Sequence, residues 1–189
     1  MYYAIYVTAG KEQLVEVLMM KGLNDSLFER CFHPVRHMRK KLRGEWREIY
    51  EKLLPGYVFI ETDDMEALYM ALKKIPRITR VLGRCGEAEE TVFYPLKDEE
   101  AEWLDHLTNP GGKIKEKPKP KQSSEAQENP VAEISKIHIG EDDRITILSG
   151  PLKGYEGRIK KYDLHRRTAQ IEVSFMGRTV LLNLGIEMV

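Results

Sequence analysis

The sequence has few of the residues that build covalent or metal-bound sites. Its 189 residues include only two cysteines, Cys31 and Cys85, too few for a disulfide framework or a cysteine-based zinc site. We expect both to be small buried hydrophobic residues. The five histidines show no metal-ligand spacing, and Pro34 disfavours a shared helix face for His33 and His37. The sequence therefore predicts neither a metal site nor a bound cofactor.

Sequence motifs of catalysis are also missing. There is no Walker A glycine loop, no GxSxG, no HExxH and no Cys-x-x-Cys pair. The longest apolar runs, such as residues 57–60, span only a few residues, whereas a transmembrane helix needs about 20. The first residues carry no basic region and no cleavage pattern of a secretory signal. We therefore expect a cytoplasmic binding protein rather than an enzyme, without a membrane segment.

Charge of one sign does not dominate the chain. Lys and Arg number 30, Asp and Glu number 30, and the formal net charge is +0. By segment, the net charge is −3 over residues 1–107, +1 over 108–134 and +2 over 135–189. Because local patches decide binding, a net charge of zero does not exclude a nucleic-acid partner.

A break in composition divides the chain. Residues 108–134 alternate proline with lysine, then turn to glutamine and serine, and hold almost no large apolar residues. Such a segment buries too little apolar surface to offset the entropy of ordering, and it is long for a loop inside a compact domain. We predict a flexible linker here, between a first domain at residues 1–107 and a second at 135–189.

The first domain mixes strand and helix patterns, which predicts an α+β fold around an antiparallel sheet. Gly22 ends one helical pattern, Asp63 and Asp64 are candidate caps for a second helix, and a turn is expected at residues 83–86. The expected elements are strands at 2–8, 57–61 and 78–82, two strands within 31–52 joined at 43–45, and helices at 11–22, around 67–72 and at 98–107.

The last 55 residues carry short β-branched or alternating runs separated by glycines. Runs at this spacing predict a small β barrel. Residues 140–159 carry a more specific pattern: a glycine leads into a strand, Gly150 and Pro151 form a turn, and Gly157 starts the next strand. This stretch resembles a KOW motif, the signature of a small SH3-like barrel found in transcription factors and ribosomal proteins.

Residues 54–61 (Leu-Pro-Gly-Tyr-Val-Phe-Ile-Glu) and 75–83 resemble the sheet core of the NGN domain of NusG-family transcription elongation factors. The order of NGN-like segment, linker and KOW-like segment extends this resemblance over nearly the whole chain outside the linker. Residues 8–12 and the basic hairpin resemble those of specialised LoaP-like antiterminator paralogues. Leu152 stands where phenylalanine commonly follows Gly-Pro, which sets the barrel apart from general members of the family.

The resemblance implies a binding function without catalysis. An NGN domain docks by an apolar depression on the clamp helices of the largest subunit of RNA polymerase and suppresses pausing, a population shift set by differential binding. Exposed aromatic residues anchor interfaces of this kind, although the same residues could be ordinary core. The positions that match the docking site are Tyr57, Phe59, Tyr6 and Leu54. A monomer is expected.

Two basic groups are candidates for nucleic-acid binding, with a solvated surface as the alternative for each. In the predicted hairpin, five basic residues fall within residues 36–43, and Glu45, Glu48 and Glu51 on the returning strand could pair with some of them. The first group is Arg36, Arg39, Lys40, Lys41 and Arg43; the second, in the barrel, is Lys160, Lys161, His165, Arg166, Arg167 and Arg178.

The leading hypothesis is a processive antiterminator that acts on specific operons and is recruited by a hairpin in the nascent leader RNA, with upstream DNA as a further contact. One alternative is a general NusG-like elongation factor that couples polymerase to Rho or to the ribosome. Another is a ribosome-associated KOW protein that binds RNA.

Overall fold

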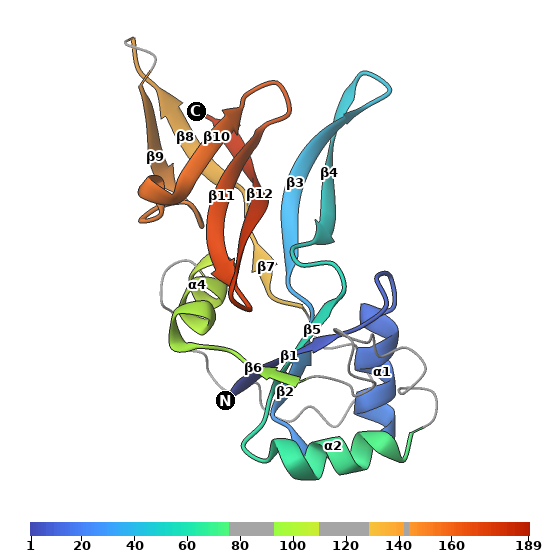
Figure 1. The fold of residues 1–189 in the computed structure, drawn as a ribbon. Coiled ribbons are helices and arrows are strands. Elements are labelled where there is room, and N and C mark those ends of the chain that lie inside the picture. The colour runs from blue at the N-terminus through green and yellow to red at the C-terminus, as the bar shows by residue number, and fades with distance from the viewer. Residues whose placement is uncertain (76–92, 110–128, 142–143) are drawn as a thin grey trace. The chain divides into compact units, whose positions relative to one another are not determined.

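The computed structural model describes residues 1–75, 93–109, 129–141 and 144–189 (Figure 1). The strand predicted at 78–82, the turn at 83–86, Cys85 and most of the predicted linker lie outside these residues. The chain divides into two compact units. The first comprises the described residues of Met1–His33, Leu54–Ala101 and Ala126–Asn129, and the second those of Pro34–Leu53, Glu102–Glu125 and Pro130–Val189.

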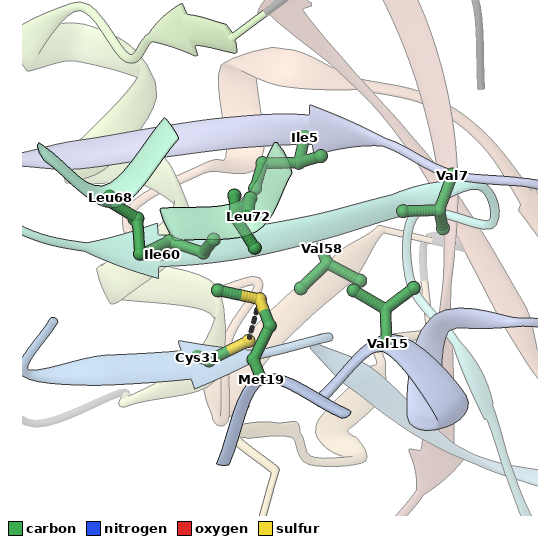
Figure 2. Packing of buried hydrophobic residues seen from close by; sticks show 9 residues of the cluster. All are labelled: Ile5, Val7, Val15, Met19, Cys31, Val58, Ile60, Leu68 and Leu72. Carbon is green, nitrogen blue, oxygen red and sulfur yellow. Dashed lines mark hydrogen bonds between the residues drawn. The ribbon is translucent and has the colours of Figure 1, made fainter. Parts of the chain in front are cut away.

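The first unit is built on a four-stranded antiparallel sheet in the order β2-β5-β1-β6. One face of this sheet packs against two helices through an apolar core that includes Ile5, Val58, Ile60, Val15 and Leu68 (Figure 2). The elements are β1 (Tyr2–Tyr6), α1 (Glu12–Gly22), η1 (Asp25–Leu27), β2 (Arg30–Phe32), β5 (Tyr57–Glu61), α2 (Met65–Lys73) and β6 (Phe93–Pro95). The predicted α+β class with an antiparallel sheet is confirmed.

Local signals explain the helices of this unit. The Asp64 side chain accepts a hydrogen bond from Ala67 N at 2.9 Å, which satisfies one of the free amides at the start of α2. Of the two predicted caps, Asp64 is therefore the one that caps the helix. Cys31 is 1% exposed, and its Sγ lies 3.5 Å from Met19 Sδ in the core (Figure 2). Burial raises the pKa of the Cys31 thiol well above its ordinary value, as expected for an inert core residue.

The second unit contains a long β hairpin of β3 (Val35–Leu42) and β4 (Glu45–Lys52). Its two-residue turn has positive φ at Arg43 (51°) and Gly44 (90°), the backbone of a type I′ turn, which matches the twist of paired strands. The sequence pattern predicts a hairpin that begins at Cys31. Instead, residues 30–32 pair with β5 and Pro34 separates them from β3, because proline cannot donate to a strand ladder.

The rest of the second unit is a five-stranded sheet in the order β10-β11-β12-β8-β9 that curls around an apolar core, including Ile137, Ile171 and Leu184, each 0% exposed. Its elements are β8 (Ser135–Ile139), β9 (Ile145–Ser149), η2 (Glu156–Arg158), β10 (Ile159–Asp163), β11 (Thr168–Phe175) and β12 (Arg178–Met188). The predicted small β barrel is confirmed. Residues 156–158, expected to start a strand, instead form the short helix η2.

Two further elements belong near the predicted domain ends. Helix α4 (Asp98–Thr108) places Trp103 fully inside, where its Nε1 donates to Ser174 O at 2.9 Å. Within the predicted linker, β7 (Val131–Ala132) pairs in parallel with β3. The hairpin belongs to the same compact unit as the barrel. The predicted domain boundaries at 107 and 135 stay a prediction. In the described ranges, no helix has the length and apolar character needed to span a bilayer.

Candidate functional site

The sheet face opposite α1 and α2 carries aromatic side chains. Tyr6 on β1 lies directly across from Tyr57 on β5, and their ring centroids are 5.5 Å apart in an edge-to-face arrangement. Both rings are half-buried, so each keeps surface in contact with solvent. An aromatic pair that is fixed yet partly exposed has the properties of an interface anchor.

The other two predicted docking residues lie in the interior. Phe59 is 0% exposed and stacks on Phe32 at 5.8 Å, and Leu54 is 5% exposed. Strand alternation does place Phe59 on the same face as Tyr57, but Phe59 lies between β1 and β2, where neighbouring side chains cover it. Burial assigns Phe59 and Leu54 to the core, and the docking role of the tyrosine pair stays a prediction.

The turn before Tyr57 is held by a buried carboxylate. Glu12, 0% exposed at the start of α1, accepts a hydrogen bond from Gly56 N at 2.8 Å. Gly56 O in turn accepts from Val7 N at 2.8 Å. These bonds fix the backbone at both ends of the Tyr6–Tyr57 pair. The sequence pattern does not predict this role of Glu12, because nothing local connects a helix start to a turn 44 residues away.

In the basic hairpin, several cations are already neutralised by cross-strand partners. Glu51 lies opposite Arg36 and pairs with it at 3.0 Å and with Lys40 at 2.5 Å, and Glu48 pairs with Arg39 at 3.0 Å. The hydrogen bond from Lys40 is the main cause that lowers the pKa of Glu51 from its ordinary value. These ion pairs are therefore intact at neutral pH and are lost as the pH falls through the lowered pKa of the carboxyl group.

Two of these arginines also fasten the hairpin to the barrel. Arg36 Nη1 donates to Asn183 O on β12 at 2.9 Å, and Arg39 pairs with Glu187 on the same strand. Gly185 lies between them, and a Cβ there would meet His37 O at 2.5 Å. The backbones of β12 and β3 therefore lie very close together. Arg36 and Arg39 hold the hairpin against the barrel, and this structural role comes before any role in binding nucleic acid.

The cations of the barrel also divide into those that have a described partner and those that have none. Lys160 pairs with Glu172 at 3.2 Å, Arg166 lies 3.8 Å from Asp163, and the Arg167 guanidinium lies over the Trp46 ring at 4.2 Å. Within the described part of the chain, five of the predicted nucleic-acid residues form neither an ion pair nor a cation–π contact. They are Lys41, Arg43, Lys161, His165 and Arg178, and all five are exposed.

The two basic groups meet in one groove of about 640 Å³ between the hairpin and the β10–β11 side of the barrel. We call this the basic groove. Its lining holds five lysines and arginines against two acidic residues, together with three apolar side chains from the hairpin. The lining residues are Arg36, Met38, Lys40, Lys41, Leu42, Trp46, Glu51, Lys161, Asp163, His165, Arg166, Thr168, Gln170 and Asn183.

Most of these cations are predicted from the sequence, but the apolar lining and the convergence of the two groups are not. The apolar lining consists of Met38 and Leu42 on one face of the hairpin and of Trp46, the partner of Lys41, on the other. Five residues predicted to bind nucleic acid do not line the groove: Arg39, Arg43, Lys160, Arg167 and Arg178. The sequence does hold a signal for this lining, because Leu42 and Trp46 are apolar residues in a strongly charged strand pattern. In the structure, Trp46 is 38% and Leu42 45% exposed.

An antiparallel sheet covered by helices, joined in one chain to a small β barrel, places this molecule among the two-domain proteins that combine an α+β domain with an SH3-like barrel. The family model described as "Transcription termination factor nusG" matches residues 1–104. The chain belongs to the NusG family of transcription termination/antitermination factors, as the resemblance of its strand and KOW motifs implied.

Relatives from several bacteria match over almost the full chain. The protein "Transcription termination/antitermination protein NusG" of Helicobacter pylori strain J99 is 24% identical, over 94% of this chain and 90% of the relative. Those of Pseudomonas aeruginosa and Thermus thermophilus are 22% and 23% identical, each over 100% of this chain and 96% of the relative. The solved structure "Domain interaction in Thermotoga maritima NusG" is 22% identical, with a TM-score of 0.44, over 97% of this chain and 92% of that chain.

Proposed function

We propose that this protein is a NusG-type factor that binds RNA polymerase and acts as a processive antiterminator on specific operons, to which a structured leader RNA recruits it. Membership of the NusG family supports the transcriptional role. The observation that carries the operon-specific part is the basic groove, which joins the cations of the hairpin to those of the barrel in one surface. Its action on transcription places the protein in the cytoplasm.

Polymerase docking is assigned to the face around Tyr6 and Tyr57. The pair is held in place by Glu12 and Gly56 and keeps part of both rings accessible. A pre-ordered aromatic pair loses little entropy on binding, which makes it a favourable anchor for the clamp helices of the largest subunit. Phe59 and Leu54 are buried, so the proposed docking surface does not include them.

The general elongation factor is the second candidate, and one observation favours it. Leu152 is 0% exposed, and its N–H donates to Ser135 Oγ at 3.0 Å, so this residue belongs to the barrel core. The leucine at this position therefore does not alter a contact surface for Rho or the ribosome. The third candidate, a ribosome-associated protein, is disfavoured because the family match covers the first 104 residues rather than the barrel.

Replacing Tyr57 with alanine tests the polymerase site. We expect the variant to fold and to lose at least about tenfold in affinity for RNA polymerase core, because it removes one ring of the anchoring pair. Pull-down of purified polymerase by the full chain measures this loss. Tyr50→Ala is the matched control, since Tyr50 is 60% exposed on β4, outside the proposed docking surface. Unchanged polymerase binding by folded Tyr57→Ala rejects the assignment.

Transcription in vitro separates the first two candidates. On templates with two successive terminators, we expect read-through only where the protein's own operon leader precedes them. Equal read-through with any leader identifies a general elongation factor. Co-purification with ribosomal subunits and not with polymerase identifies the third candidate.

A further inference from the structure

The basic groove has the size of a small-ligand site. Its volume of about 640 Å³ falls within the range of pockets that enclose a drug-sized or nucleotide-sized molecule. The hairpin contributes Met38, Leu42 and Trp46 to its lining, and the barrel contributes Lys161 and His165. The groove is half-open, so one group of a longer strand can enter it while the rest of the strand stays outside.

The charges available in the groove select an anion. Arg36 and Lys40 are occupied by Glu51, whereas Lys41 and Lys161 form no ion pair with any residue that the structure describes. His165 is exposed on the same rim. Lysines from the hairpin and the barrel can contact successive phosphates of one strand, since each ammonium acts as a point charge with three donors.

The Trp46 ring adds a second requirement for the ligand, which phosphate alone does not meet. Trp46 is 38% exposed, and the Arg167 guanidinium 4.2 Å from its ring holds it in position. Lys41 is the cross-strand partner of Trp46 and therefore lies on the same face of the hairpin, whereas Met38 and Leu42 lie on the other face. A planar base stacks on the Trp46 ring, but bases in a paired helix have their faces covered by their neighbours, so only an unpaired base can bind there.

We propose that the basic groove receives an unpaired nucleotide of the recruiting RNA, with its base against Trp46 and its phosphates at Lys41 and Lys161. This inference rests on the proposed recruitment by RNA and specifies which part of the RNA is recognised. The binding element is then a bulge or a loop rather than a continuous stem, and the hairpin and barrel read it together.

The test compares a ten-nucleotide single-stranded RNA with a duplex of the same length, using the full chain in mobility-shift titrations. We expect the single strand to bind more tightly. Trp46→Ala should weaken single-strand binding by about tenfold, the usual contribution of one stacked base, and leave duplex binding unchanged. The combined Lys41→Gln and Lys161→Gln variant should lower the salt slope of single-strand binding by about 1.4, as two lost phosphate contacts predict.

Matched controls lie outside the groove. Tyr50→Ala removes an exposed aromatic residue of β4, and Lys136→Gln removes an exposed lysine of β8 that does not line the groove. Both should bind the single strand as the parent chain does. Circular dichroism confirms that each variant is folded.

The outcomes separate the groove assignment from recruitment by RNA. If both RNAs bind and Trp46→Ala affects neither, the groove assignment is overturned while recruitment by RNA stands. If single-stranded DNA of the same sequence binds as tightly as the RNA, the assignment to RNA is overturned. If neither RNA binds at all, this inference fails, while transcription behind the protein's own operon leader still tests recruitment by RNA and the polymerase pull-down still tests the docking face.

Discussion

Replacing Trp103 with alanine should lower the free energy of unfolding by about 3–5 kcal/mol, the cost of deleting a fully buried aromatic ring. The Trp103 side chain is 0% exposed, packs edge-on against Phe175 with ring centroids 6.1 Å apart, and donates its Nε1 proton to Ser174 O. The substitution leaves a cavity and removes this bond. Urea denaturation followed by circular dichroism measures the change.

Trp46→Ala is the matched control. Trp46 is 38% exposed and makes its described ring contact with Arg167, so its loss should cost about 0.5–1 kcal/mol, the value of an exposed cation–π pair. Equal destabilisation by the two variants would contradict the placement of Trp103 in the core of the second unit.

Gly185→Ala should separate the hairpin from the barrel and lower the free energy of unfolding by about 3 kcal/mol, the upper end for overpacking, because the neighbours are rigid backbone. The new Cβ would lie 2.5 Å from His37 O and 3.3 Å from Met38 Cα. Strands β3 and β12 must then move apart, which strains the Arg36–Asn183 bond. Hydrogen exchange should show faster exchange of the amides in Val35–Leu42.

Gly157→Ala is the corresponding control, since a Cβ at Gly157 meets no described atom within 4 Å. We expect it to leave both stability and the exchange of β3 nearly unchanged. If Gly185→Ala behaves in the same way, the close approach of β12 to β3 is wrong. Because the basic groove lies between the hairpin and the barrel, Gly185→Ala should also weaken single-stranded RNA binding, in contrast to Gly157→Ala.

Local patterns predicted most elements of this fold. The strand at residues 57–61 matches β5, the Asp64 cap starts α2, and the predicted turn at 43–45 contains the Arg43–Gly44 turn. Each signal acts within a few residues, through backbone geometry or a capping bond, so it can be read from the chain. The KOW-like spacing likewise predicted the barrel, because turns at regular intervals restrict a short chain to few arrangements.

The site was predicted less completely, because it depends on contacts between distant segments. Alternation showed that Phe59 shares a face with Tyr57 but could not show that Phe59 is covered. Cross-strand pairing explains why Glu51 neutralises Arg36 and Lys40, an alternative that the sequence had left open. The approach of Lys161 to the hairpin has no local signal, since 120 residues separate it from Lys41.

The chain has only two tryptophans, and the structure gives them opposite environments. Trp103 is sealed in the interior, whereas Trp46 lines the basic groove under the Arg167 guanidinium. The molecule therefore carries a built-in optical reporter: a ligand in the groove should quench or shift the emission of Trp46, while the blue-shifted emission of Trp103 stays constant until the fold is lost. Groove occupancy and folding can thus be followed separately in one spectrum without an added dye.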